Sequence, residues 1–251
     1  MEHYALAAQV YGVALIFARL GAFFALMPGV NESGVPPLVR LSFTLLFSIM
    51  MFPVLAKGMP AEPTLLSDMA FQITMEIMVG LFLGLFLSLF MASLSVAGEI
   101  MSLQSTLSFS QTVNPLEAQP TTSVTSFLTM VGLALLFTTD LHEVFIAGIV
   151  RSYHLFPAGR GAPLADMSAA VLKTFSDTFA LGLQLSAPVM VFSLVYHISL
   201  GFIARAMPQF QVFFISTPLT VLLGLAIIAL GLGGTGIVWT SHFRDFVGQW
   251  I

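Results

Sequence analysis

The sequence predicts an all-α membrane protein with about six hydrophobic helices arranged as hairpins, some of them short or kinked, and a polar plug-like loop. Composition is the first observation: 57% of the 251 residues are hydrophobic and 8% are charged, against about 25% charged residues in soluble domains. So few charges cannot cover the surface of a soluble protein of this size. The second observation is a series of long apolar stretches separated by polar or proline-bearing breaks.

Six apolar stretches lie between these breaks: 4–27, 41–55, 69–97, 124–139, 178–204 and 210–239. Because crossing about 30 Å of hydrocarbon takes about 20 helical residues, the first, third, fifth and sixth are long enough to span a bilayer. The second is too short, and the fourth spans only if its helix continues past Asp140 and Glu143. We expect these two to be half-helices or helices buried in protein, within a single polytopic membrane domain over residues 1–251.

Several function classes are excluded by what the chain lacks. The net charge is −4 and the Lys and Arg residues are scattered singly, so nucleic-acid binding is not expected. The absence of cysteine excludes disulfides and thiolate chemistry. The G-x-G-x-x-G pattern at 231–236 ends an apolar stretch instead of following a strand, and the His and acidic residues of 140–154 lack metal-site spacing. We therefore predict a non-enzyme without a cofactor, a metal site or catalytic residues.

The segment between Gly98 and Ser123 is polar but nearly uncharged. It is rich in amide and hydroxyl side chains, and Glu99 and Glu117 are its only charged residues. Such a composition suits a segment enclosed by protein or facing a water-filled cavity. An ordinary extramembrane loop is the alternative.

Small residues recur every four positions in the third apolar stretch, at Gly80, Gly84, Ser88 and Ala92. This spacing places them on one face of a helix, where they form a ridge of small side chains. The ridge predicts close packing against another helix, in this chain or in a partner.

Two charged residues, Arg19 and Glu76, lie inside apolar stretches. A charge at membrane depth is costly, so it usually faces a cavity, a partner or the interface. Arg19 and Glu76 either pair with each other, as intramembrane charges, or reach the interface separately, Arg19 by snorkelling.

Two prolines, Pro188 and Pro218, lie inside the fifth and sixth apolar stretches. Each removes one backbone hydrogen bond from a helix, so a kink is expected at both positions. The kink is either a fixed structural feature or a moving hinge.

Four motifs, distributed over nearly the whole chain, are similar to one known family. They read ARLGAFFALMPGV, GEIMSLQSTLSFSQTVNP, LHEVFIAGIVRSYHLFPAG and RAMPQFQVFFISTPLTVLLG. Together they resemble the FliR family of flagellar export-apparatus proteins, which is related to the SctT subunits of virulence type III secretion.

The resemblance implies a subunit of the flagellar type III protein export apparatus, in the bacterial inner membrane at the flagellar basal body. With FliP- and FliQ-like subunits, and next to FlhA- and FlhB-like proteins, it would form a gated channel that passes unfolded flagellar proteins. Residues 1–177 would be a FliP-like part and 178–251 a FliQ-like helical hairpin. The apolar surface would then contact these subunits as well as membrane lipid.

The resemblance also implies that the polar segment is the family's plug, lying in the closed gate. Its gate-loop residues would be Gln104, Phe109, Gln111, Asn114 and Pro115. Members of the family commonly carry a glycine where this chain has Ser105 and Thr106, so we expect a less sharp bend there.

Three other functions stay open at this point. A virulence secretion subunit would have the same chemistry as a flagellar one. A secondary transporter would use broken helices and a coupling charge, for which Glu76 or Arg19 are candidates. An intramembrane enzyme would need catalytic groups facing each other at depth, and His and Asp are scarce in the apolar stretches.

Overall fold

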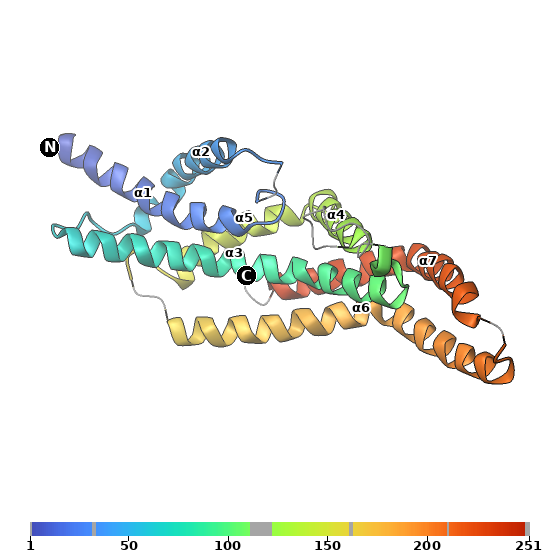
Figure 1. The fold of residues 1–251 in the computed structure, drawn as a ribbon. Coiled ribbons are helices and arrows are strands. Elements are labelled where there is room, and N and C mark those ends of the chain that lie inside the picture. Colours follow the sequence, from blue (N-terminus) through green and yellow to red (C-terminus); the bar gives the residue numbers. More distant parts are fainter. Residues whose placement is uncertain (1, 32–33, 111–121, 161–162, 210, 249–251) are drawn as a thin grey trace. The chain divides into compact units, whose positions relative to one another are not determined.

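A computed structural model describes residues 2–31, 34–110, 122–160, 163–209 and 211–248, and every regular element in these ranges is a helix (Figure 1). The elements are α1 (Glu2–Leu26), α2 (Pro37–Leu55), η1 (Ala56–Gly58, a 3-10 turn), α3 (Leu66–Gln104), η2 (Leu107–Ser110, also 3-10), α4 (Ser123–Thr138), α5 (Leu141–Leu155), α6 (Leu164–Ala206) and α7 (Val212–Gly248). Five helices are long and apolar enough to cross a membrane, and α4 with α5 would make a sixth as one broken span. The predicted all-α membrane fold is confirmed.

Helix α2 differs from the expectation for the second apolar stretch. It begins at Pro37, four residues before the predicted start, because proline at the first helical position needs no N–H partner and has a helical φ. It then continues through Pro53 to a length of 19 residues, which is enough to span a bilayer. The expectation of a half-helix was therefore wrong here, and only 17% of this span is buried within the chain itself.

The fourth apolar stretch is a short helix, as expected. Helix α4 covers 16 residues and ends at Thr138, and α5 begins at Leu141. Between them Asp140 has a φ of 55°, in the left-handed region, which interrupts helical geometry and is tolerated better by Asp than by most residues.

Three helices are much longer than a bilayer is thick. Helices α3, α6 and α7 contain 39, 43 and 37 residues. At 1.5 Å per residue their lengths are about 58, 64 and 55 Å, against a hydrocarbon layer of about 30 Å. Six ordinary spans therefore do not describe this chain, because a large part of each long helix cannot lie in hydrocarbon.

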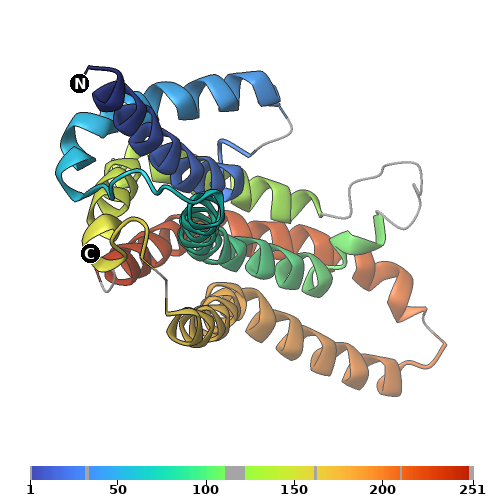
Figure 2. The same ribbon diagram turned by 90° about the vertical axis from the view of Figure 1, so that its left-hand side faces the viewer.

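The chain forms two compact units, each made of several segments. The first unit contains Met1–Phe90, Asp140–Phe175 and Phe246–Ile251. Helices α1 and α2 lie side by side in it (Figure 2), and the Phe24 ring packs edge-on against Phe43 and Phe47, with ring centroids 5.1 and 5.8 Å away.

The core of the first unit is largely aromatic. Phe82, Phe86 and Met167 form a buried cluster, and Phe246 stacks on Phe86 at a centroid distance of 6.0 Å. Helices from distant parts of the sequence thus share one core.

The second unit contains Met91–Thr139 and Ser176–Asp245. Trp239 of α7 is fully buried in it, and its Nε1 donates a hydrogen bond to the Ser93 Oγ of α3, 3.2 Å away. Helices α6 and α7 form a hairpin (Figures 1 and 2), in which the Tyr196 hydroxyl donates to the Ser216 carbonyl oxygen at 3.1 Å. Trp239 thereby fixes the hairpin to α3.

We expect Trp239→Ala to lower the free energy of unfolding by about 3–5 kcal/mol, because it leaves a cavity and removes the indole hydrogen bond to the Ser93 hydroxyl. Thermal unfolding of the purified chain in mild detergent measures this. The matched control is Ile237→Ala on the same helix, where the side chain is 72% exposed and the change should be below about 1 kcal/mol. Equal effects of the two variants would contradict the assigned role of Trp239.

Candidate functional site

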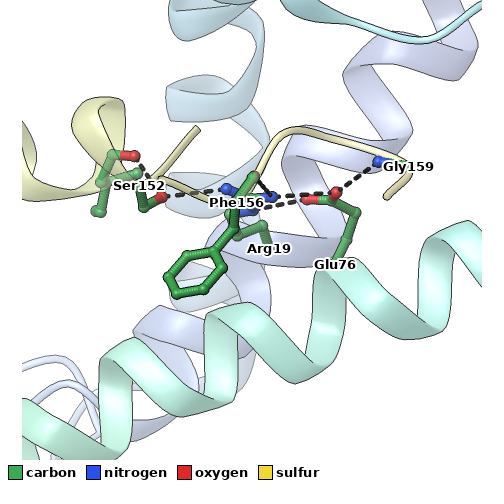
Figure 3. A network of polar contacts seen from close by, with 6 residues as sticks. Arg19, Glu76, Ser152, Phe156 and Gly159 are labelled. Atoms are coloured by element: carbon green, nitrogen blue, oxygen red, sulfur yellow. Dashed lines mark hydrogen bonds and ion pairs between the residues drawn. The ribbon is translucent and has the colours of Figure 1, made fainter. Parts of the chain in front are cut away.

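The structure brings Arg19 of α1 and Glu76 of α3 into direct contact in the first unit (Figure 3). Arg19 Nε lies 2.6 Å from Glu76 Oε2, and Nη2 lies 3.1 Å from Oε1, so the pair is bidentate. Both residues are 1% exposed. The guanidinium carbon also lies 3.8 Å from the centroid of the Tyr153 ring, which is a cation–π distance.

The last turn of α5 and the segment after it complete this network (Figure 3). Arg19 Nη1 donates to the Ser152 Oγ at 3.1 Å, and Nη2 donates to the Phe156 carbonyl oxygen at 2.9 Å. The Gly159 N–H donates to Glu76 Oε1 at 3.2 Å. Each nitrogen of the buried cation thus has an acceptor, as burial of a charge demands.

The small-residue ridge of α3 lies against α1. A Cβ built on Gly80 would collide with the Arg19 carbonyl oxygen, and one built on Gly84 would lie 2.9 Å from the Leu26 Cβ. The Ser88 Oγ donates to the Leu26 carbonyl oxygen at 2.5 Å. The partner of the ridge is therefore internal at these three positions, and side chains larger than these would separate the two helices.

Glu76 is the first member of the same four-residue stripe that includes the ridge. Because the ridge allows α1 to approach α3 closely, Arg19 can reach Glu76 with two hydrogen bonds. Ala92, the last member of the stripe, is half-buried and belongs to the second unit.

An apolar cavity of about 90 Å³ adjoins the ion pair on the side of Ser152. Its walls are mainly aromatic and aliphatic side chains of α1, α3 and α5, among them Phe23, Phe82 and Phe145. A hydrated ion needs several polar partners, which such walls do not supply. The arrangement therefore favours a structural clamp, in which the ion pair joins α1, α3 and the segment after α5, over a coupling site for transport.

Of the predicted gate-loop residues, Gln104 lies at the end of α3 in the second unit. Gln104 is the last residue of α3, and its Oε1 accepts a hydrogen bond from the Ser193 Oγ of α6 at 2.7 Å. His197 Nδ1 lies 2.7 Å from the Ser193 carbonyl oxygen and 3.2 Å from its Oγ. Because a carbonyl only accepts, Nδ1 carries the proton, and the Ser193 hydroxyl is left to donate to Gln104.

The remaining gate-loop residues lie wholly or partly outside the described part of the chain. Phe109 belongs to η2, but its side chain is not among those described. Gln111, Asn114 and Pro115 lie outside the described residues. Their place in a plug stays a prediction.

The chain makes a turn at Ser105-Thr106, the position where we expected a less sharp bend. Thr106 has a φ of 61°, in the left-handed region, where a β-branched residue costs about 1–2 kcal/mol. The Thr106 Oγ1 and the Ser102 Oγ are buried and have no hydrogen-bond partner within the described residues. Ser105 is 1% exposed, and a Cβ on Gly224 of α7 would lie 2.6 Å from its Cβ.

Glu99 ties the two ends of the polar segment together. Its Oε1 accepts hydrogen bonds from the Thr122 N–H at 3.2 Å and from the Thr125 hydroxyl at 2.9 Å. Thr122 is the N-cap of α4, so the carboxylate lies at a helix N-terminus, where a negative charge is favoured. The Glu99 carboxylate thus holds the last part of α3 next to the start of α4.

The two predicted helix kinks lie within continuous helices. Pro188 is inside α6 and Pro218 is inside α7, and the helical pattern continues on both sides of each. Whether either position moves as a hinge stays a prediction.

Several contacting residues had no role assigned from the sequence. Ser152, Phe156 and Gly159 lie in the LHEVFIAGIVRSYHLFPAG motif, and Glu99 opens the GEIMSLQSTLSFSQTVNP motif, so the motifs contain them without indicating what they contact. Ser193 has no signal of its own. Across the ranges that the structure describes, no three His, Asp or Glu side chains gather at a position that could hold a metal ion.

The chain is similar to known proteins over most of its length. The family model described as "Bacterial export proteins, family 1" matches residues 10–246. The flagellar biosynthetic protein FliR of Caulobacter vibrioides is 44% identical over 98% of this chain and 98% of its own length. The proteins of the same name from Escherichia coli and Bacillus subtilis are 30% and 26% identical, over 84% and 82% of this chain and 80% of their own lengths.

We expect Arg19→Met or Glu76→Leu alone to destabilise the chain by about 3–5 kcal/mol, since each leaves one buried charge without its partner. The double variant should be less destabilised than either single variant, because no buried charge remains. Denaturant unfolding in detergent measures all three, with the exposed Arg205→Met as the control. Additive losses in the double variant would contradict a paired role.

Proposed function

The chain belongs to the FliR family of bacterial export proteins and is a subunit of the flagellar type III protein export apparatus, and from this premise we propose that it forms a gated channel with FliP- and FliQ-like subunits. The channel passes unfolded flagellar proteins across the bacterial inner membrane at the flagellar basal body. FlhA- and FlhB-like proteins are its neighbours. The chain itself is a multi-pass membrane protein, with several helices apolar enough to span a bilayer.

The exposed apolar surface supports assembly with other subunits. Large exposed apolar side chains run along α6 from Leu164 and Leu172 to Ile198 and Phe202, and α7 adds Leu222 and Leu230. Since these helices are about twice as long as the hydrocarbon layer, lipid alone cannot cover this surface. Partner helices would cover the rest. In our proposal residues 178–251 are the FliQ-like hairpin and residues 1–177 the FliP-like part.

The gate proposal rests chiefly on the geometry of Glu99. Glu99, in the last part of α3, bonds to the N-cap and the first turn of α4, so the two described ends of the polar segment lie close together. A loop anchored in this way can fill a pore without taking part in the helix packing around it. Its amide and hydroxyl side chains suit a wet or protein-lined enclosure, and few charges would have to be desolvated.

The chain has a structural role in this proposal, and it needs no cofactor of its own. Family membership fits a non-enzymatic export subunit. The buried Arg19 and Glu76 support this role, because they pair with each other and hold three segments together.

Deleting residues 107–119 should make cells that assemble the complete complex permeable to small solutes, because the deletion removes the loop but keeps its base. Uptake of a normally excluded small solute measures the leak. The control is the same deletion in cells that lack the FliP-like subunit, which should stay tight because no channel forms. Unchanged permeability in the complete complex would sink the plug assignment.

Extraction in a gentle detergent should yield this chain in a large hetero-oligomer, whose mass is the sum of several FliP- and FliQ-like subunits and one copy of this 27.0 kDa chain. Native mass measurement after affinity purification tests this. The control is extraction in a harsh detergent, which should release the separate subunits. A stable lone monomer under the gentle conditions would contradict the assembly.

A further inference from the structure

We propose that Ser193 is a positioning residue which, through its hydrogen bond to Gln104, latches the end of α3 over a strained turn at Thr106 and so holds the channel closed. This inference rests on the proposed gate function and adds a device for regulating it. All the residues involved belong to the second unit and are described.

The latch is one well-formed hydrogen bond between two long helices. Ser193 is 1% exposed, and its hydroxyl lies 2.7 Å from Gln104 Oε1. The Nδ1–H of His197, one turn further along α6, faces the Ser193 carbonyl and hydroxyl oxygens, so the hydroxyl proton is directed to Gln104. Gln104 is the last helical residue before the polar segment, so fixing its side chain fixes the direction in which the chain leaves α3.

The turn that follows is costly to maintain. Thr106 has a left-handed backbone, and its hydroxyl is buried without a hydrogen-bond partner among the described residues, as is the Ser102 hydroxyl one turn earlier. Ser105 packs so closely on Gly224 that the turn cannot relax toward α7 while α3 stays in place. Strain of this kind persists only where surrounding contacts impose it.

The two features oppose each other. The Gln104–Ser193 hydrogen bond favours the closed turn, while the φ of Thr106 and the unpaired hydroxyls disfavour it. When the latch breaks, Thr106 can return to an ordinary backbone conformation and its hydroxyl can reach water or a partner. Opening therefore releases strain, and a single net hydrogen bond shifts the ratio of closed to open channels by about fivefold.

The test uses single-residue variants in cells that assemble the complete complex, with solute leak as the readout. Ser193→Ala and Gln104→Met each remove the latch from one side and should raise the leak about fivefold. The double variant should leak no more than either single variant, because both break the same hydrogen bond. Ser193→Thr keeps the hydroxyl and should stay near the wild-type leak.

Thr106→Gly should act in the opposite direction, because glycine adopts the left-handed conformation without strain and lacks the buried hydroxyl. In the Ser193→Ala background it should lower the leak about fivefold, back toward the wild-type value. Ser199→Ala is the matched control, since Ser199 is exposed on the same helix and its hydroxyl donates to the Val195 carbonyl oxygen of that helix. It should leave the leak unchanged.

Hydrogen exchange on the purified complex gives a second readout at the turn itself. The amides of Ser105 and Thr106 bond to the Met101 and Leu103 carbonyl oxygens, and their protection should fall about fivefold in Ser193→Ala.

If the loop deletion opens the channel, two results would overturn the latch. One is a wild-type leak in Ser193→Ala, and the other is a leak in the double variant equal to the product of the two single-variant increases. If the loop deletion itself causes no leak, the gate function fails and the latch fails with it.

Discussion

The ion pair between Arg19 and Glu76 is the contact on which the first unit depends. A charge removed from water must be compensated, and here two charged residues that are each 1% exposed compensate one another. Their pairing requires α1 and α3 to lie almost backbone to backbone, which the glycines of the ridge permit. The segment around Ser152 then folds onto the guanidinium, because the remaining nitrogens need acceptors. A single electrostatic requirement thus organises three segments that are distant in sequence.

Polar groups also determine how the helices pack in the second unit, where the desolvation cost is lower because most of these groups are uncharged. The Glu99 carboxylate accepts from the Thr122 N–H at the start of α4. The Trp239 indole donates to the Ser93 hydroxyl, and the Ser193 hydroxyl donates to the Gln104 side-chain oxygen. Each of these hydrogen bonds connects α3 to a different helix. In apolar surroundings such bonds define the register between helices, because a slip by one turn would leave a buried donor or acceptor unpaired. Helix α3 is therefore the element to which α4, α6 and α7 are all fixed.

The proposed gate needs both a rigid scaffold and an element that can move. The rigid part is the helix packing around α3, with its buried aromatic and ion-pair contacts. The turn at Thr106 differs in kind, since its backbone is strained and its hydroxyl unpaired within the described residues. Because the strained turn is held by one neighbouring hydrogen bond, breaking that bond can change the conformation of the turn while the helix packing stays intact.

The sequence by itself determined the membrane class, the all-α fold and the family, because composition, apolar periodicity and motif order can be read from the chain without its contacts. It left open whether Arg19 meets Glu76, and it placed the start of α2 too late. Only the tertiary structure decided the pairing, the contact partner of the ridge, and the roles of Glu99 and Ser193. These depend on contacts between residues 23 to 137 positions apart, for which no local pattern carries a signal.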